Sequence, residues 1–138
     1  MTATTRSSFL AVGVGCRAGV SGEVIAELIE AALAAAPGAD LPVALFTVLD
    51  KQSEVGIADA AARLGHPLVH LPRVALESVA DRIVTRSEKV IELFGVPSIA
   101  EGAALAGAGA DGRLVVERMS HRGATVAVAL SGPAGGTP

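Results

Sequence analysis

Aromatic side chains are almost absent from this chain of 138 residues, which has no Trp, no Tyr and three Phe. Proteins that bind RNA or single-stranded DNA stack bases on such side chains, so these partners are disfavoured. Positive charge is also scarce, because the net charge is −3 and the pI is near 5.5, which argues against duplex DNA. No nucleic-acid partner is therefore predicted. A small acidic ligand is compatible with this composition, since a few clustered Arg and Lys residues suffice to bind one.

Cysteine is represented by Cys16 alone, which excludes an internal disulfide framework and a cysteine-rich metal site. The three histidines show no metal-ligand spacing, so neither a metal nor another cofactor is predicted. A reducing cytoplasm is the expected location. The apolar run 9–14 is short for the core of a secretion signal, and no stretch approaches the roughly 18 apolar residues of a membrane span. No membrane partner is predicted either.

The pattern of apolar residues predicts one α/β domain over residues 8–130, with 1–7 and 131–138 as flexible termini. Residues 9–14 form a continuous apolar run, which is typical of a strand buried on both faces. Further strands are predicted at 42–49, 68–71, 113–118 and 124–130, and helical segments at 22–36, 57–64, 74–83, 87–94 and 97–108. The expected fold is a three-layer α/β/α domain with a mostly parallel sheet of about five strands. It ends in a hairpin whose loop is 119–123.

The segment from Gly13 to Ser21 combines features that bind anions. A buried strand runs into a glycine-rich turn with Arg17, and Ser21 then stands as the N-cap of a periodic helix. Free backbone N–H groups, the positive end of the helix dipole and the Arg17 guanidinium would converge there, which favours a carboxylate or phosphate. Lys51 follows the second strand and is expected at the same edge of the sheet, where ligands bind in open α/β folds.

The same glycine turn leaves two other interpretations open. Residues 13–18 match the dinucleotide pattern G-x-G-x-x-G/A, although a third glycine comes one residue late at Gly19 and the bulky Arg17 crowds the pyrophosphate position. A nucleotide-binding module is therefore one alternative. Cys16 is the basis of the other, because a helix N-terminus and Arg17 would lower the pKa of its thiol and make it a nucleophile. One of the histidines would then serve as the base.

Residues 13–21 resemble the opening G-[IV]-G-C-R-x-G-x-[ST] of the CobE/CbiG C-terminal domain family of cobalamin biosynthesis. Further segments of the chain match motifs of this family in the same order. They are residues 47–54 (T-x-x-x-K-x-x-E), 64–68 (L-G-x-P-L), 85–90 (T-x-S-E-x-V), 95–104 (G-V-[PS]-S-[VI]-A-E-x-x-A) and the last strand, 124–129. The resemblance covers roughly residues 8–130, which makes it more specific than any single motif.

The resemblance implies an α/β/α domain that acts on corrin-ring intermediates in the cytoplasm. The chain has no counterpart of the other CbiG regions, so it is expected to be the stand-alone form of the aerobic route. Such a protein would bind a precorrin or corrin intermediate as a carrier or accessory factor, and other enzymes of the corrin pathway are further candidate partners. CbiG proteins instead open a lactone on a precorrin-5-type intermediate and release acetaldehyde, so a lactone hydrolase is the alternative. Whether the chain is an enzyme stays open.

The hydrolase alternative needs a residue that activates water or attacks the substrate. Glu101 or Glu88 would act as the general base, or Cys16 as the nucleophile. In a binding protein the same carboxylates are expected to orient loops, cap helices or pair with basic residues, because they would repel an acidic ligand.

Corrin precursors carry many acetate and propionate groups, so the resemblance implies a rim of cations and N–H donors around an apolar wall. Arg17 would bind one carboxylate bidentately and Lys51 would act as a point charge, while Arg118 and His121 close the other side. Backbone amides of the glycine turn would bind another carboxylate. The family often carries lysines in the loop before the last strand, and this chain instead has residues 117–122. The candidate ligand-binding residues are Gly13, Gly15, Cys16, Arg17, Gly19, Ser21, Lys51, Thr85, Ser87, Ser98, Arg118 and His121.

Overall fold

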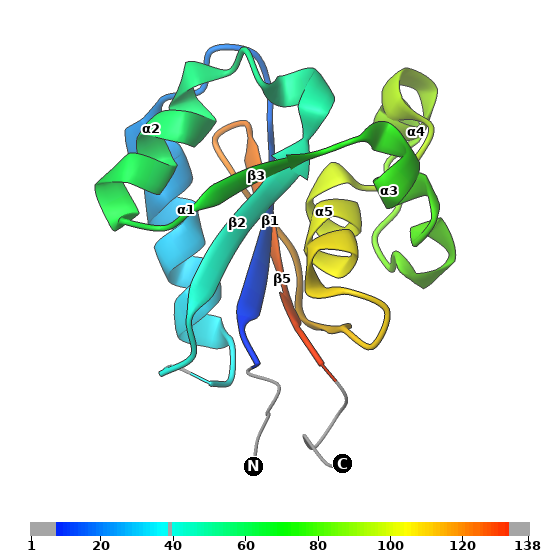
Figure 1. The fold of residues 1–138 in the computed structure, drawn as a ribbon. Coiled ribbons are helices and arrows are strands. Elements are labelled where there is room, and N and C mark those ends of the chain that lie inside the picture. The colour runs from blue at the N-terminus through cyan, green and yellow to red at the C-terminus, as the bar shows by residue number, and fades with distance from the viewer. Residues whose placement is uncertain (1–7, 39, 133–138) are drawn as a thin grey trace.

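The computed structural model describes residues 8–38 and 40–132, which contain a five-stranded sheet (Figure 1). Its strands are β1 (Leu10–Cys16), β2 (Val43–Val48), β3 (Leu68–Leu71), β4 (Arg113–His121) and β5 (Ala124–Leu130). Their order across the sheet is β3-β2-β1-β5-β4. β1, β2 and β3 run parallel, whereas β5 is antiparallel to both β1 and β4. The predicted flexible segment 1–7, and residues 133–138 of the predicted C-terminal tail, lie outside the described residues.

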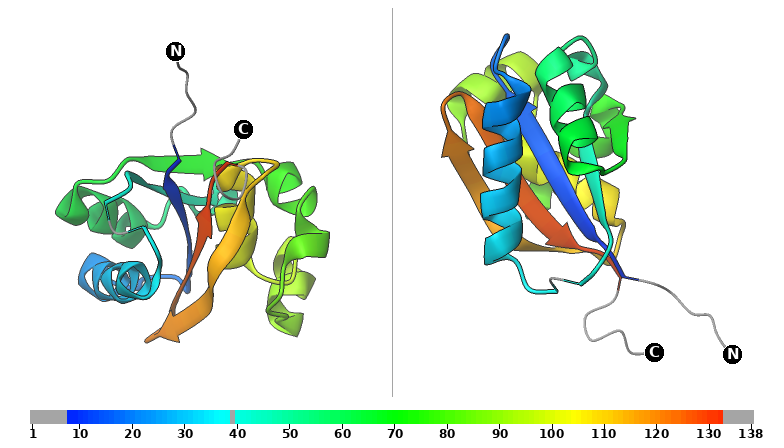
Figure 2. Two further views of the ribbon diagram at one scale, coloured as in Figure 1. Left: turned by 90° about the horizontal axis from the view of Figure 1, so that it is seen from below. Right: turned by 90° about the vertical axis from the view of Figure 1, so that its left-hand side faces the viewer.

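Helices cover both faces of the sheet (Figure 1, Figure 2). One face carries α1 (Gly22–Ala35) and α2 (Val55–Leu64). The other carries α3 (Arg73–Glu77), α4 (Glu88–Phe94) and α5 (Ile99–Ala108), and short 3-10 turns form η2 (Leu49–Lys51) and η3 (Ala80–Arg82). The predicted three-layer α/β/α fold, with its mostly parallel sheet and C-terminal hairpin, is confirmed.

The two faces of the sheet are packed with different side chains. Leu, Ile and Val residues fill the space beneath α1 and α2. Beneath α5 the core is rich in alanine, so that this helix lies close to the sheet. At the closest point, a Cβ added to Gly13 of β1 would stand 1.9 Å from the backbone oxygen of Ala100. Gly13 is therefore required for packing of α5 onto β1.

Serine side chains begin three of the helices. Ser21 accepts a hydrogen bond from the Val24 amide at 3.2 Å and caps α1, as the sequence predicts. Ser87 and Ser98 cap α4 and α5 in the same way. Each hydroxyl oxygen thus satisfies an amide that has no partner within its own helix.

Two predicted segments differ from the structure. The helix predicted at 74–83 is divided into α3 and η3, because the chain turns after Ser78. The predicted loop 119–123 is wrong, since β4 continues to His121 and only two residues form the turn. These are Arg122 with φ 51° and Gly123 with φ 92°, both positive as in a type I′ hairpin turn. The polar residues at the end of β4 suggested a loop, but an edge strand with one exposed face tolerates them.

Hydrogen bonds connect the residue before β1 to the residue after β5. The Phe9 amide donates to Ser131 Oγ at 2.8 Å, and the Ser131 amide donates to the Phe9 carbonyl at 3.0 Å. Ser131, which the sequence assigned to the C-terminal tail, is 4% exposed and belongs to the folded part.

Within the described residues, no single helix is both long and apolar enough to cross a membrane. α4 and α5 taken together reach that length and composition, but they are bent by 64° relative to each other. Most of α5 is buried against the sheet, as is typical of a core helix.

Candidate ligand-binding site

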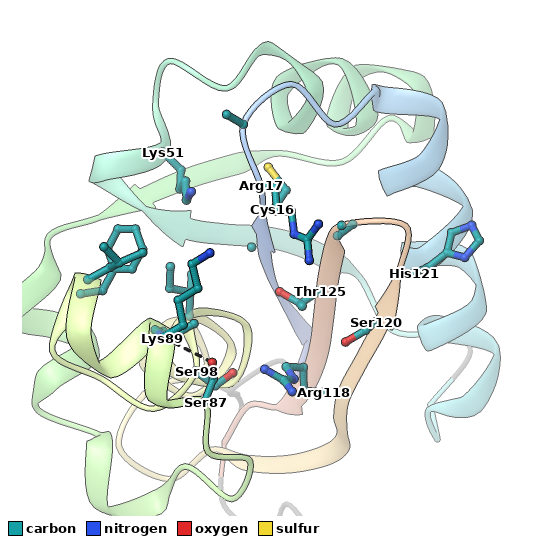
Figure 3. Close-up of a pocket in the computed structure, with 18 of the residues that line it drawn as sticks. Cys16, Arg17, Lys51, Ser87, Lys89, Ser98, Arg118, Ser120, His121 and Thr125 are labelled. Atoms are coloured by element: carbon teal, nitrogen blue, oxygen red, sulfur yellow. Dashed lines mark hydrogen bonds between the residues drawn. The ribbon is translucent and has the colours of Figure 1, made fainter.

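A pocket of about 790 Å³ lies at the edge of the sheet where β1 and β4 end and β5 begins (Figure 3). α4 and the first residues of α5 form its opposite wall. At this edge the chain leaves β1 toward α1 on one face, while α5 covers the other face. Open α/β sheets bind their ligands at such a position, beyond the carboxyl ends of the strands.

Five basic residues line this pocket: Arg17, Lys51, Lys89, Arg118 and Arg122. No Asp or Glu is among the described residues that line it. In the described part of the chain, none of the five forms an ion pair within 4.0 Å. Figure 3 shows the side chains of Arg17, Lys51 and Lys89 pointing into one space. A chain with a net charge of −3 thus has a concave site lined by positive side chains, which is the kind of site that would attract an acidic ligand.

The pocket also has an apolar wall. Val90, Leu93 and Phe94 of α4 contribute to it, and Leu93 is 55% exposed. Lys51 Nζ lies 5.2 Å from the centroid of the Phe94 ring, a cation–π distance. Arg73 Cζ lies 5.5 Å from the same centroid. A ligand that carries anionic groups on an apolar frame would match both parts of this surface.

The structure brings most of the predicted ligand-binding residues together at the pocket. The lining includes Gly15, Cys16, Arg17, Lys51, Ser87, Ser98, Arg118 and His121. The His121 ring is turned away from the pocket and lies over α1 (Figure 3). Its Nε2 is 3.4 Å from Glu27 Oε1. The imidazole of His121 therefore does not close the pocket in the way that the sequence predicted.

The other predicted binding residues lie away from the pocket. Gly13 is beneath α5, Ser21 caps α1, and the Thr85 hydroxyl donates to Glu101 at 2.6 Å. The Gly19 amide donates to Glu54 Oε1 at 3.0 Å. These residues shape the loops and helices around the site, and they do not line it.

Two amides of the glycine turn, which the sequence predicts to be free for a ligand, are bonded within the protein. The amide of Arg17 donates to the Gly123 carbonyl at 2.9 Å, and the Glu54 carboxylate occupies the anion position at Gly19. An anion in this pocket would therefore be held by the basic side chains more than by the backbone. A phosphate-binding loop of the dinucleotide type is also disfavoured. Its first glycine would be Gly13, which here packs against the backbone of α5.

Cys16, the last residue of β1, is buried, with 8% of the residue exposed. Burial raises its pKa, Glu54 raises it further, and Lys51 lowers it by less. The sequence-based expectation of a lowered pKa is therefore wrong. A thiol that stays protonated at neutral pH is a weak nucleophile.

The two carboxylates considered for catalysis are placed differently from each other. Glu88 is exposed in the first turn of α4 and pairs with Arg86 at 2.7 Å, outside the pocket lining. Glu101 is fully buried and accepts hydrogen bonds from the amides of Val84, Thr85 and Arg118 as well as from the Thr85 hydroxyl. Burial raises the pKa of Glu101, but these hydrogen bonds outweigh it and hold the pKa below its ordinary value.

Several pocket residues are missed by the sequence analysis. Lys89, Val90, Leu93 and Phe94 share one face of α4, at spacings of one and four residues. This spacing is visible in the sequence, but it equally describes a helix that packs on a core. Thr125, at the start of β5, lines the pocket without any motif to mark it. No cluster of three potential metal ligands occurs in the residues that the structure describes.

A family model described as "Cobalamin synthesis G C-terminus" matches residues 10–129. The chain belongs to this family. Protein CobE of Sinorhizobium sp is 36% identical over 132 residues, which are 95% of this chain and 84% of that protein. A cobalt-precorrin-5A hydrolase of Priestia megaterium is 32% identical over 126 residues, which are 91% of this chain but only 33% of the hydrolase.

Two solved structures of cobalamin biosynthesis proteins share the fold. The 1.7 Å crystal structure of CobE, a protein from the cobalamin (vitamin B12) biosynthetic pathway, gives a TM-score of 0.81 at 32% identity. The alignment covers 89% of this chain and 90% of CobE. Cobalamin biosynthesis protein chiG from Agrobacterium tumefaciens gives a TM-score of 0.66 at 32% identity, over 88% of this chain and 98% of that one. The expectation of a cobalamin biosynthesis protein is confirmed, and the nucleotide-binding and hydrolase alternatives are not favoured.

Proposed function

We propose that this chain binds a corrin-ring intermediate of cobalamin biosynthesis that carries free carboxylates, as a carrier or accessory factor. The observation that carries the proposal is the pocket with five basic side chains and no acidic one among the described residues. Membership of the cobalamin synthesis family supports the choice of a corrin over other acidic ligands.

The pocket suits the chemistry of a corrin edge. Acetate and propionate groups around the ring would pair with Arg17, Arg118 and Arg122 in two-pronged hydrogen bonds and with the lysines as point charges. The apolar ring would lie against the exposed face of α4 at Leu93 and Phe94. The volume of about 790 Å³ is within the range of small-molecule sites, so it accommodates a large part of such a ligand.

The site favours binding over bond cleavage. General acid–base catalysis needs a titratable group within hydrogen-bond reach of the reacting atoms. Of the residues that the sequence offered for catalysis, Glu88 and Glu101 do not line the pocket, the His121 ring points away from it, and the pKa of Cys16 is raised. The cytoplasmic location and the delivery of the ligand to other enzymes of the pathway stay predictions from the sequence.

A spectroscopic titration tests the proposal. Cobyrinic acid, a corrin with free carboxylates, is expected to change its visible spectrum saturably on addition of the protein, with micromolar affinity that weakens as salt is added. The fully methyl-esterified corrin is the control, because it keeps the ring and lacks the charge. Equal affinity for the acid and the ester would contradict the proposed role of the basic pocket. Binding of NAD or ATP at micromolar concentration, with no binding of cobyrinic acid, would overturn the proposed function.

A further inference from the structure

Glu101 lies in the first turn of α5, and its carboxylate is buried without a positive partner among the described residues. Four donors surround it. Oε1 accepts from the amides of Val84 and Thr85, both at 2.8 Å. Oε2 accepts from the Thr85 hydroxyl at 2.6 Å and from the Arg118 amide at 2.9 Å. A buried carboxylate satisfied in this way holds its neighbours in fixed positions, because loss of any one bond leaves the buried charge less well compensated.

The Arg118 amide is available to Glu101 because β4 is irregular at this point. The register of β4 with β5 shifts between Val116 and Met119, so Arg118 lies in a bulge. A bulge leaves a residue outside the regular ladder and redirects its side chain. Here it places Arg118 in the pocket lining while Glu101 satisfies its amide.

The other two residues bound by Glu101 begin the segment that leads to α4. This helix has no buried residue, yet it supplies Lys89 and the apolar wall. The position of α4 therefore depends on the hydrogen bonds of the preceding residues, 84–87. The Glu101 carboxylate holds Val84 and Thr85, and the Ser87 amide donates to the Pro97 carbonyl at 3.0 Å just before α5.

The geometry points to Glu101 as the positioning residue of the site, whose carboxylate sets the separation between β4 at Arg118 and the segment leading to α4. Glu101 acts through these neighbours and does not touch the ligand. The effect on ligand affinity rests on the proposed function, because it supposes that the same pocket binds a corrin with free carboxylates. The fixed arrangement of α5, of β4 at Arg118 and of the segment leading to α4 does not depend on a ligand, so it can be tested in the free protein.

Glu101→Gln tests this inference in two measurements. Glutamine has an NH2 group in place of one carboxylate oxygen, so the Thr85 hydroxyl and the Arg118 amide lose their acceptor when this group takes the place of Oε2. The bonds from the Val84 and Thr85 amides then go to a neutral oxygen and are weaker than bonds to a carboxylate. In the free protein, hydrogen exchange followed by NMR is expected to speed up about tenfold at Val84, Thr85 and Arg118, and to stay unchanged in β1. At a temperature where the variant is folded, its dissociation constant for cobyrinic acid is expected to rise about tenfold or more.

Glu88→Gln is the matched control, because it neutralises an exposed carboxylate in the first turn of α4 and should change neither measurement. Thr85→Val removes one donor to Glu101 and should give a smaller effect in the same direction, while Thr85→Ser keeps the hydroxyl and should behave as the natural chain. If Glu101→Gln does not fold, comparison of Thr85→Val with Thr85→Ser tests the positioning role of Glu101 in its place.

A purely structural role for Glu101 would give a different pattern. Lower stability with unchanged affinity would overturn the inference, as would unchanged exchange at the three amides. If the natural chain binds no cobyrinic acid, the proposed function fails. The positioning of Val84, Thr85 and Arg118 by Glu101 is then tested by hydrogen exchange alone. Faster exchange in the variant then supports it, and unchanged exchange overturns it.

Discussion

At the scale of the residue, Arg17 shows how a basic side chain is prepared for a ligand. Its amide is fixed to the Gly123 carbonyl at the tip of the β4–β5 hairpin, while its side chain is exposed and unpaired in the described part of the chain. The backbone is thus held without using the guanidinium. Because the backbone is already ordered, only the side chain would lose entropy when a ligand binds.

Arg17→Ala is expected to weaken the binding of cobyrinic acid by about 1.5–3 kcal/mol, which is the range for a hydrogen bond to a charged group. The thermal midpoint of unfolding should change little, because the side chain is exposed. Isothermal calorimetry of both variants measures the effect. Arg63→Ala is the control, since Arg63 pairs with Asp59 on α2 and does not line the pocket. A dissociation constant equal to that of the natural chain would remove Arg17 from the site.

At the scale of the element, the β4–β5 hairpin has a turn residue that is unfavourable for its conformation. Type I′ turns need positive φ at both central residues, and Asn-Gly is the preferred pair. This chain has Arg122 at φ 51° before Gly123, and Arg122 lines the pocket. The strained position places a guanidinium at the rim, as local strain often does at functional sites.

Arg122→Asn is expected to stabilise the protein by about 0.5–1 kcal/mol, because asparagine adopts the left-handed conformation more readily. The same change should weaken cobyrinic acid binding about tenfold by removing a charged donor. Urea denaturation and a spectroscopic titration measure the two effects. Arg122→Lys keeps the charge and should retain most of the affinity with no gain in stability. If Arg122→Asn bound the ligand as tightly as the natural chain, the turn would have no part in recognition.

At the scale of the whole molecule, stability depends on pH through the buried Glu101. Its pKa is held below the ordinary value by hydrogen bonds to the charged form, so its contribution is complete above the unfolded pKa of about 4.3. That contribution decreases as the pH falls below this value and is lost below the pKa of the folded state.

The difference in unfolding free energy between the natural chain and Glu101→Gln is therefore expected to be constant above about pH 4.3 and to shrink in more acidic solution. Urea denaturation at a series of pH values measures this difference. Glu88→Gln, whose carboxylate is exposed, should follow the natural chain throughout. A difference that is the same at acidic and neutral pH would show that ionisation of Glu101 does not stabilise the fold.

The fold could be predicted from the sequence because apolar periodicity is a local signal. The strand Leu68–Leu71 has the predicted bounds, and Ser21 caps α1 as expected. The edge of the sheet that carries Arg17 and Lys51 was also predicted, since parallel strands place their carboxyl ends together.

Other properties of the site depend on contacts between segments far apart in the chain. The amide of Gly19 is used by Glu54, and the amide of Arg118 is released by a bulge that no sequence pattern marks. The direction of the His121 ring depends on the register of β4, because adjacent residues of a strand face opposite sides. The sequence placed His121 in a loop, where this alternation does not apply, so the direction of its ring could not be predicted.

The hydrogen bonds between Phe9 and Ser131 have a consequence for how this fold combines with others. They place both boundaries of the folded part at the same end of β1 and β5 (Figure 1). The pocket lies at the opposite end of these two strands, at Cys16 and Ala124. Additional polypeptide attached at either boundary would extend away from the basic rim without obstructing it. A segment similar to this chain makes up 33% of the cobalt-precorrin-5A hydrolase, and boundaries at the end away from the pocket are compatible with such a place in a longer protein.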